Sequence, residues 1–265
     1  MKKILKAVIP AAGMGTRFLP ITKAVAKEML PIIDKPAIHY VIQEAIDAGI
    51  IDILIITSDR KPEIRKYFNE NLFLKEVLKN KSETNLLEEI EKTYKSIKIS
   101  FLNQLEPKGL GDAIRLAKDF INNEPFAVLL PDDIIENKGL INATKECINA
   151  FYECESLIIG VQKVDKKDIS KYGIIQSSNY NNNLIDIEKI VEKPSIEEAP
   201  SNIASIGRYI FLPSIFSVIN HTKPTKKNID IDITSSINII IGKNKIYGTF
   251  ISGKRVDTGH KLGYF

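Results

Sequence analysis

The sequence predicts an α/β fold in which helices wrap a mostly parallel, mixed sheet. Short apolar runs rich in Ile, Val and Leu alternate with longer amphipathic stretches over the first 160 residues, which is the pattern of strand–helix–strand units. The runs are nearly continuous in apolar character, as expected of strands that are covered on both faces. The chain of 265 residues is long enough for one such domain with a sizeable core.

Each expected element follows from this alternation. Strands are expected at residues 4–10, 52–57, 97–102, 126–130 and 156–161. Helices are expected at 36–48, over much of 61–94 with a break near 80–82, at 109–121, and between the last two strands. Pro36 is placed in the first turn of its helix, and Gly49 at the end. Because crossovers are right-handed, the loops after the strands gather along one sheet edge, where such sheets bind ligands.

The pattern changes near residue 160. A hairpin is expected from residues 173–176 and 185–191 around the polar turn 177–183, followed by a strand at 203–212. Helices are expected near 213–220 and 231–241, and an extended end at 246–256. No internal repeat is present, so residues 1–265 are interpreted as a single domain with a second part that begins near residue 160.

Composition excludes several classes of protein. Hydrophobic residues make up 44% of the chain and charged residues 26%, which are ordinary globular values. No apolar run reaches about 18 residues, so neither a transmembrane helix nor a membrane partner is expected. Cys147 and Cys154 have neither metal-ligand nor disulfide-framework spacing, which favours the cytoplasm. The net charge of +4 is mild and the lysines are scattered, so no nucleic-acid partner is expected.

A glycine-rich loop directly after the first strand is the strongest single motif. It carries Gly13 and Gly15, and glycines let backbone N–H groups approach phosphates closely. Arg17 adds a planar, permanently charged clamp and Lys27 a second cation. A Gly-x-Gly pair is also compatible with an ordinary tight turn. A dinucleotide-binding loop would need a third glycine and a helix, which Pro20 opposes, and a P-loop would need Gly-Lys-Ser/Thr, which is missing.

The wider loop has a more specific resemblance. The segment from Gly13 to Pro31 resembles the signature loop of the sugar-phosphate nucleotidyltransferases, with the motif Gly-x-Gly-Thr-Arg-x-x-Pro-x-Thr-x4-Lys-x3-Pro. Glu28-Met29-Leu30-Pro31 is similar to the bacterial UTP–glucose-1-phosphate uridylyltransferases in particular. The resemblance implies a Rossmann-like three-layer sandwich of the nucleotide-diphospho-sugar transferase type. It also implies a nucleotide-binding part at about 1–160 and a sugar-binding part at about 161–265.

Site roles follow from this resemblance, position by position. It implies nucleotide binding by Ala11, Ala12, Gly13, Gly15, Thr16, Glu28, Gln104 and Gly109, catalysis by Arg17, Lys27 and Lys193, and sugar binding by Gly173, Glu192, Ile206 and Gly207. The residues themselves leave more than one interpretation open. Gln104 beside Gly109 suits the donor and acceptor edge of a pyrimidine but also a strand-end turn. Glu192 and Lys193 before a proline also read as an exposed ion pair, and Gly207 as a bulge.

Two carboxylates are expected to hold Mg²⁺. Asp132 follows Leu-Pro at the carboxyl end of a strand, where a metal-binding carboxylate belongs, although a helix N-cap is the alternative. For Asp133 we prefer the helix cap. Asp257 lies in a terminus that resembles the family's Asp-x-Gly-x-Lys-x-Gly-Tyr, and a turn aspartate is its alternative. The resemblance implies the metal role for Asp132 and Asp257.

The implied reaction joins UTP and glucose 1-phosphate to give UDP-glucose and pyrophosphate, in a homo-oligomer. Two departures from the family occur, at Ala26, where a proline is common, and at residues 229–235. The terminal helix of relatives is expected to be absent. Two other hypotheses stay open, namely a glucose-1-phosphate thymidylyltransferase and a non-catalytic paralogue. A nucleotide panel separates the first alternative from the uridylyltransferase, and binding without turnover would indicate the second.

Overall fold

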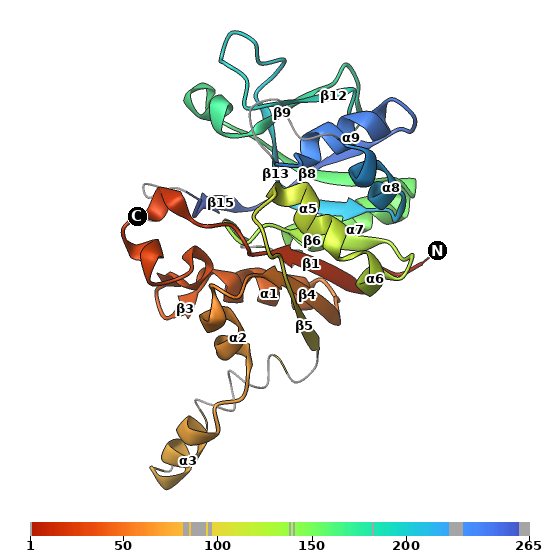
Figure 1. Cartoon of the computed structure of the whole chain (residues 1–265). Coiled ribbons are helices and arrows are strands. Elements are labelled where there is room, and N and C mark those ends of the chain that lie inside the picture. Colours follow the sequence, from red (N-terminus) through yellow and green to blue (C-terminus); the bar gives the residue numbers. More distant parts are fainter. Residues whose placement is uncertain are drawn as a thin grey trace.

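A mixed sheet of eleven strands runs through the middle of the described part of the molecule (Figure 1). The computed structural model describes residues 2–81, 85, 94, 97–137, 139, 141–181, 183–222 and 230–259. One path through the sheet has the order β10-β11-β14-β8-β13-β6-β1-β4-β5, and β9 and β12 branch from β13. The expected α/β sandwich with a mostly parallel, mixed sheet is therefore confirmed.

Four parallel strands form one side of this sheet. They are β1 (Lys6–Pro10), β4 (Asp52–Thr57), β5 (Lys98–Asn103) and β6 (Phe126–Leu129). Ala7 pairs with Ile53 on one side and with Ala127 on the other. Because these strands run in one direction, their carboxyl ends meet at one edge, and the loops that follow β1, β5 and β6 come together there.

The long strand β13 (Ile203–Phe211) reverses the direction in the centre of the sheet. It is antiparallel to β6 and to β8 (Ile158–Lys163), and its register shifts between Ser205 and Tyr209. The remaining strands of this side are β9 (Gly173–Gln176), β10 (Tyr180–Asn181), β11 (Leu184–Asp186), β12 (Lys189–Glu192) and β14 (Tyr247–Phe250). The two sequence parts therefore share one sheet, since β13 lies between β6 and β8.

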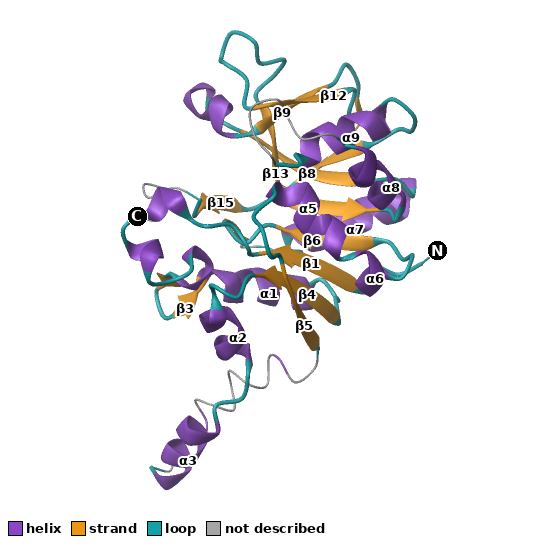
Figure 2. Cartoon of the chain, viewed as in Figure 1, coloured by secondary structure: helices purple, strands orange, loops and turns teal. Residues whose placement is uncertain are grey.

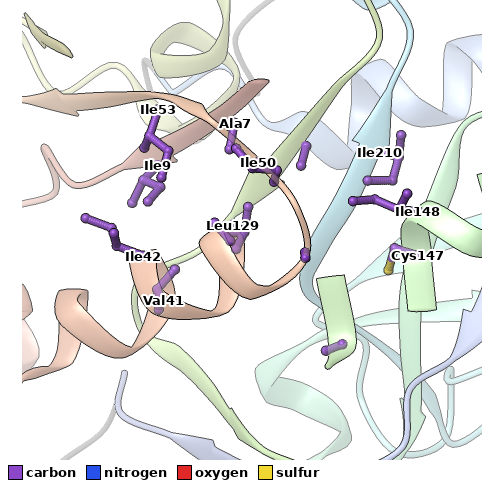
Figure 3. Packing of buried hydrophobic residues seen from close by; sticks show 14 of the residues in the cluster. Ala7, Ile9, Val41, Ile42, Ile50, Ile53, Leu129, Cys147, Ile148 and Ile210 are labelled. Atoms are coloured by element: carbon purple, nitrogen blue, oxygen red, sulfur yellow. The ribbon is translucent and has the colours of Figure 1, made fainter. Parts of the chain in front are cut away.

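Helices cover both faces and produce three layers (Figure 2). One face is covered by α1 (Ala37–Asp47) and α7 (Ala143–Cys154). The other is covered by α5 (Gly109–Leu116), α6 (Lys118–Ile121), α8 (Ser214–His221) and α9 (Ile233–Ile241). Successive residues of a strand point to opposite faces, so Ala7 and Ile9 pack in the first layer and Val8 in the second. Figure 3 shows how Ile9, Val41 and Ile42 fill the space between α1 and the sheet.

Helix α1 differs from its prediction by one position. Pro36 is extended and precedes the helix as its N-cap, because it also pairs with Pro31 in the ribbon of β2 (Pro31–Ile32) and β3 (Lys35–Pro36). The helix ends as expected, since Gly49 has a φ of +97°, a conformation that glycine adopts at little cost.

The helix expected between the strands at 126–130 and 156–161 is confirmed as α7, but an unexpected strand precedes it, because Asp133–Glu136 forms β7 and pairs with β15 (Lys254–Asp257). The expected second strand of the hairpin is divided, because residues 184–186 pair with β14 while residues 189–192 pair with β9. Both differences come from pairing partners that are distant in sequence, which a local pattern does not reveal.

The charged stretch after residue 61 forms α2 (Pro62–Phe68) and α3 (Leu72–Asn80), and α3 projects from the body (Figure 1). Residues 82–84 and 86–93 of the predicted helix lie outside the described residues. None of the helices in the described part of the chain has the length and apolarity needed to cross a membrane.

An aromatic cluster fixes α2 to α1. His39 is 4% exposed, and its Nδ1 lies 2.9 Å from the Tyr67 hydroxyl and also contacts the Tyr94 hydroxyl. Two hydroxyl groups at one ring nitrogen favour an unprotonated acceptor at Nδ1. Burial, reinforced by the charge of Lys35 and opposed by Asp34, lowers the pKa of His39 from 6.5 to about 4.

We expect this cluster to make folding acid-sensitive. A histidine whose pKa is lowered by folding contributes stability that is present above pH 6.5 and is lost as the pH falls towards 4. The variant His39→Asn keeps an acceptor but cannot titrate. As the pH falls from 6.5 to 4, the difference in the free energy of unfolding between the wild type and the variant should change by on the order of 2 kcal/mol, with the wild type losing stability relative to the variant. Denaturant unfolding at several pH values measures this, and parallel pH profiles would contradict it.

Candidate functional site

The loop that follows β1 leaves a set of backbone donors free. Ala11 N–H still donates to Ile56 O over 2.7 Å, and the chain then leaves the sheet. Three short turns follow, at Thr16–Phe18, Ile21–Lys23 and Lys27–Met29. The N–H groups of residues 13–16 make no hydrogen bond to any described residue. Free N–H groups in a glycine-rich loop are suited to phosphate oxygens.

Gly15 allows this loop to fold back. Its φ is +64°, and a Cβ at this position would lie 3.1 Å from Thr22 Cγ2 and 3.3 Å from Lys27 Cβ. The Thr22 hydroxyl donates to Gly15 O over 2.8 Å. A side chain at residue 15 would be strained and crowded, so the glycine keeps Lys27 close to the start of the loop.

Two adjoining cavities open at the carboxyl edge of the sheet. The first, here called the loop cavity, has a volume of about 500 Å³, and its wall includes Ala12, Gly13, Thr16, Lys27, Glu28, Gln104, Gly109 and Asp132. The second, called the hairpin cavity, has a volume of about 650 Å³, and its wall includes Arg17, Asp132, Tyr172, Gly173, Glu192, Lys193, Gly207, Arg255 and Asp257. Asp132 and Gly109 belong to both walls, so the cavities meet there.

Most of the residues singled out from the sequence line one of these cavities, and three do not. Ala11 is fully buried beneath the loop cavity, and Gly15 supports the loop without lining it. Ile206 is also fully buried and packs in the core beside α1 and α7. Neighbouring residues of a strand face opposite ways, so Ile206 lies in the core while Gly207 lines the hairpin cavity.

A partly buried ion pair lies at the boundary of the two cavities. Lys27 Nζ is 2.7 Å from Asp132 Oδ2. Burial acts to lower the pKa of Lys27, but the carboxylates of Asp132 and Glu28 outweigh it, so the net pKa is raised. Burial likewise acts to raise the pKa of Asp132, and Lys27 outweighs it, so that pKa is lowered. Asp132 is therefore an anion and Lys27 a cation at neutral pH.

Asp257 is brought to Asp132 by the ribbon of β7 and β15. Asp257 pairs with Asp133 in this ribbon, and Thr258 N–H donates to Asp132 O over 2.9 Å. A Cβ added at Gly259 would lie 2.9 Å from Asp257 Oδ1 and 3.4 Å from Asp132 Oδ2, so both carboxylates face the same small space. Two carboxylates with room between them suit a magnesium ion that takes its other ligands from phosphates and water.

Tyr172, which packs against the ribbon, orients the carboxylate of Asp257. The Tyr172 hydroxyl donates to Asp257 Oδ2 over 2.7 Å, and its ring lies 4.2 Å from the Arg255 guanidinium carbon. Burial and the hydrogen bond to Asp257 raise the pKa of Tyr172, which keeps the hydroxyl protonated as a donor. Arg255 Nε donates to Asp133 Oδ1 over 2.6 Å. Asp133 is therefore an ion-pair partner in β7, and the helix-cap prediction for it was wrong because no helix begins there.

Behind Asp132 lies a fully buried arginine. Arg208 forms a two-point pair with Glu44, with Nε–Oε1 at 2.9 Å and NH2–Oε2 at 2.7 Å. Its remaining donors reach the carbonyls of Leu130, Gly207 and Asp133. The carbonyls of Leu130 and Asp133 flank Asp132, so this one guanidinium fixes the backbone on both sides of the candidate metal carboxylate.

Glu192 and Lys193 lie at the far side of the hairpin cavity. Glu192 Oε2 accepts from the Thr234 hydroxyl over 2.9 Å, and Lys193 Nζ is 2.9 Å from Glu192 Oε1. Lys193 has a φ of +45°, an uncommon conformation for a residue with a side chain. Its N–H donates to Tyr172 O, which supports this turn. The pair is half-exposed, so the ion pair and the ligand-binding interpretations both fit its geometry.

Gln104 and Gly109 form the other end of the loop cavity. Gln104 Nε2 donates to Asp112 Oδ2 over 2.8 Å and to Gly109 O over 3.3 Å, which leaves its carbonyl as the group for a ligand. Gly109 has a φ of +89°, and a Cβ there would lie 2.9 Å from Ile231 O. Ile231 crosses the start of α5, because its N–H donates to Lys108 O and its carbonyl accepts from Gly111 N–H.

Several site residues were not identified from the sequence. Tyr172, Arg255, Arg208, Thr234 and Lys61 each act through a partner at least 33 positions away. Arg255 carries a local signal, since it shares a strand face with Asp257, two positions on. The other four carry no signal of this kind.

Comparison with known proteins gives a consistent result. A protein-family model described as nucleotidyl transferase matches residues 6–265. The UTP–glucose-1-phosphate uridylyltransferase of Staphylococcus epidermidis is 44% identical over 264 residues, which cover 100% of this chain and 91% of that protein. A UTP-bound UGPase from Acinetobacter baumannii has a TM-score of 0.92 and 34% identity, covering 98% of this chain and 90% of that one. A UDP-glucose pyrophosphorylase in complex with UDP-glucose has a TM-score of 0.90 and 39% identity, covering 98% and 96%.

The buried arginine leads to a stability prediction. Arg208→Leu leaves the Glu44 carboxylate buried without its counter-ion, and we expect a loss of about 3–5 kcal/mol in the free energy of unfolding. The double variant Arg208→Leu/Glu44→Leu removes both charges and should be less destabilised than the single variant. Lys167→Leu is the control, because Lys167 and its partner Asp165 are 77% and 75% exposed, and it should cost under about 1 kcal/mol. Equal losses for Arg208→Leu and Lys167→Leu in denaturant unfolding would contradict the prediction.

Proposed function

Because this chain belongs to the nucleotidyl transferase family, we propose that it transfers a uridylyl group from UTP to glucose 1-phosphate and releases pyrophosphate. The observation that carries the proposal is the meeting of two cavities at Asp132, beside Lys27. One cavity has the backbone donors for a nucleotide, and the other has the charged side chains for a phosphorylated sugar. A phosphorus atom at their boundary would be accessible from both.

The nucleotide would occupy the loop cavity. The free N–H groups after Gly13 would bind the phosphates of UTP, and Arg17 would add a cation at the entrance to the second cavity. The Gln104 carbonyl and the backbone beside Gly109 would read the uracil edge. Ala12, Thr16 and Glu28 complete the predicted contacts at this end.

Enzymes of this family generally use a divalent metal ion, and we assign the metal site to Asp132 and Asp257. Their oxygens converge on the space beside Gly259, and oxygen ligands from two carboxylates plus substrate phosphates favour Mg²⁺. When bound, Mg²⁺ would supply charge neutralisation at the phosphate oxygens.

The transfer needs positioning more than proton chemistry. The phosphate oxygen of the sugar is already an anion, so no general base is required for its attack on the α-phosphorus. Lys27 lies at the boundary of the cavities and would neutralise charge that develops there. Lys193 would hold the sugar phosphate in line with the nucleotide, and pyrophosphate would leave from the opposite side.

The sugar would lie in the hairpin cavity, against β9 and β12. Glu192 would accept hydrogen bonds from sugar hydroxyls, with its carboxylate oriented by Thr234. The backbones at Gly173 and Gly207 allow close approach, and Gly207 already packs closely, since a Cβ there would lie 2.6 Å from Asp133 Oδ2. A contribution of Ile206 is limited to its backbone, because its side chain is in the core.

The decisive assay is pyrophosphate release from UTP and glucose 1-phosphate in the presence of Mg²⁺. Release should require all three components and stop when EDTA removes the metal. Reactions with dTTP in place of UTP test the thymidylyltransferase alternative, and kcat/KM should be higher for UTP. A higher kcat/KM for dTTP would overturn the choice of nucleotide, and UTP binding without turnover would indicate the non-catalytic paralogue.

The variant Asp132→Asn tests the metal site. The amide can still accept from Lys27 but carries no charge for the metal, so kcat should fall by roughly 10²–10³-fold while the fold is kept. Asp186→Asn is the control, since Asp186 faces Lys245 on the surface, away from both cavities, and it should leave kcat unchanged. Full activity of Asp132→Asn at every Mg²⁺ concentration would exclude the metal role.

Three further expectations stay predictions. They are the location in the cytoplasm, the assembly into a homo-oligomer, and the division of a single domain into a nucleotide part up to about residue 160 and a sugar part beyond it. Residues 260–264 of the terminal motif lie outside the described residues, so the prediction made from them also stays open.

A further inference from the structure

A buried lysine beside α2 makes two contacts under the loop cavity. Lys61 is 7% exposed and directly precedes α2. Its Nζ donates to Ala11 O and to Glu28 Oε2, each over 2.8 Å. The first contact reaches the residue where the chain leaves β1, and the second reaches the turn that carries Lys27. One ammonium group therefore joins the end of β1, beneath the loop cavity, to Glu28 in the wall of that cavity.

The start of α2 holds this turn at a second point. Glu63 Oε1 accepts from Ala26 N–H over 2.7 Å. Ala26 and Glu28 are thus both bound to α2, and Lys27 lies between them and points the other way, to Asp132. A shift of the turn would move the Glu28 and Lys27 side chains together. The position of Lys27 at the boundary of the cavities therefore depends on contacts made by α2.

Glu28 has one carboxylate oxygen left over. The residue is 1% exposed and lines the loop cavity, and Oε2 is taken by Lys61. Oε1 is buried and has no hydrogen-bond partner among the described residues. A buried acceptor without a partner is costly unless a ligand supplies a donor. Its place in the cavity wall indicates a donor on the nucleotide.

We infer that Lys61 is a positioning residue for the nucleotide, which holds Glu28 as an acceptor-only group and fixes the Ala11 end of the glycine loop. The inference rests on the proposed function, and it extends that function to base selection. The imide N–H of uracil is a donor that Glu28 Oε1 would share with the Gln104 carbonyl, whereas the corresponding ring nitrogen of cytosine is an acceptor. A fixed carboxylate oxygen therefore favours UTP over CTP, because CTP would leave two acceptors facing each other.

Loss of the ammonium should weaken nucleotide binding without displacing Lys27, because Glu63 still holds the turn at Ala26. In Lys61→Met the Ala11 carbonyl and the Glu28 carboxylate would both lose the donor that holds them in place. The Glu28 carboxylate could then turn away from the base, and it would distinguish uracil from cytosine less well. The hairpin cavity has no contact with Lys61, so the affinity for glucose 1-phosphate should be unaffected.

The same strand offers a matched control. Lys6 lies at the opposite end of β1, 2.7 Å from Glu124 Oε2, and donates to the carbonyls of Phe120 and Ile121 over 3.0 and 3.2 Å. It thus has the same kinds of partner as Lys61, but it lines neither cavity. Lys6→Met removes a lysine with comparable structural contacts and should leave catalysis unchanged.

The experiment compares the wild type, Lys61→Met, Lys61→Gln and Lys6→Met. Calorimetry measures Kd for UTP and CTP, and steady-state kinetics measures KM for both substrates. We expect Lys61→Met to raise Kd and KM for UTP about tenfold, to change KM for glucose 1-phosphate less than twofold, and to reduce the preference for UTP over CTP. Lys61→Gln keeps a side-chain donor, so its Kd and KM for UTP should lie between those of Lys61→Met and the wild type. It also serves as the test if Lys61→Met does not fold.

The outcomes separate the inference from the proposed function. Wild-type protein that neither binds UTP nor releases pyrophosphate would overturn the proposed function itself. An active wild type whose Lys61 variants keep the same UTP-to-CTP ratio and the same KM for UTP would overturn the inference alone. Equal losses of affinity for UTP in Lys61→Met and Lys6→Met would assign Lys61 a structural role and would likewise overturn it.

Discussion

The ion pair of Arg208 and Glu44 is the interaction on which the rest of the structure depends. Burial of two charges is costly, and the cost is met only when every donor and acceptor is satisfied. Arg208 uses its guanidinium on Glu44 and on three carbonyls, while Glu44 also accepts from Thr144. These partners belong to α1, β13, α7 and the backbone around Asp132. The pair therefore fixes the central strand, the helical layer and the candidate metal carboxylate relative to one another.

The site is built outward from this point by pairs of opposite charge. Asp133 pairs with Arg255, Asp132 with Lys27, and Glu28 with Lys61. Each pair joins segments that are far apart in the sequence, and each has one member on the edge where the parallel strands end. The pairs of Asp133 and Glu28 are buried and the pair of Asp132 is partly buried, so water screens them less than it screens surface charges. A polyanionic substrate would thus meet cations that are already in place.

The sequence predicts the parts of the site that depend on local pattern. The strand alternation predicts which strand ends meet, and this places Asp132 and Gln104 on one edge. The glycine loop predicts the free N–H groups after Gly13. Ile206 was assigned with Gly207 because they are neighbours in a motif, but a strand sends neighbouring side chains to opposite faces. Asp133 was expected to cap a helix. The local sequence does not reveal its true partner, because the pairing with Arg255 joins positions 122 residues apart. The role of Lys61 could not be predicted for the same reason, since nothing near it in the sequence indicates contacts with Ala11 or Glu28.

The placement of β13 bears on how the chain folds. β6 borders β1 on one side and β13 on the other, and β13 ends only at Phe211. While the chain is being synthesised, the first four parallel strands are complete long before this partner exists, so β6 presents an open edge of unpaired N–H and C=O groups. The insertion of β13 closes that edge and brings Arg208 to Glu44 in the same event. Non-local pairing of this kind is slow to form, and it makes the first 160 residues an incomplete folding unit rather than an independent one.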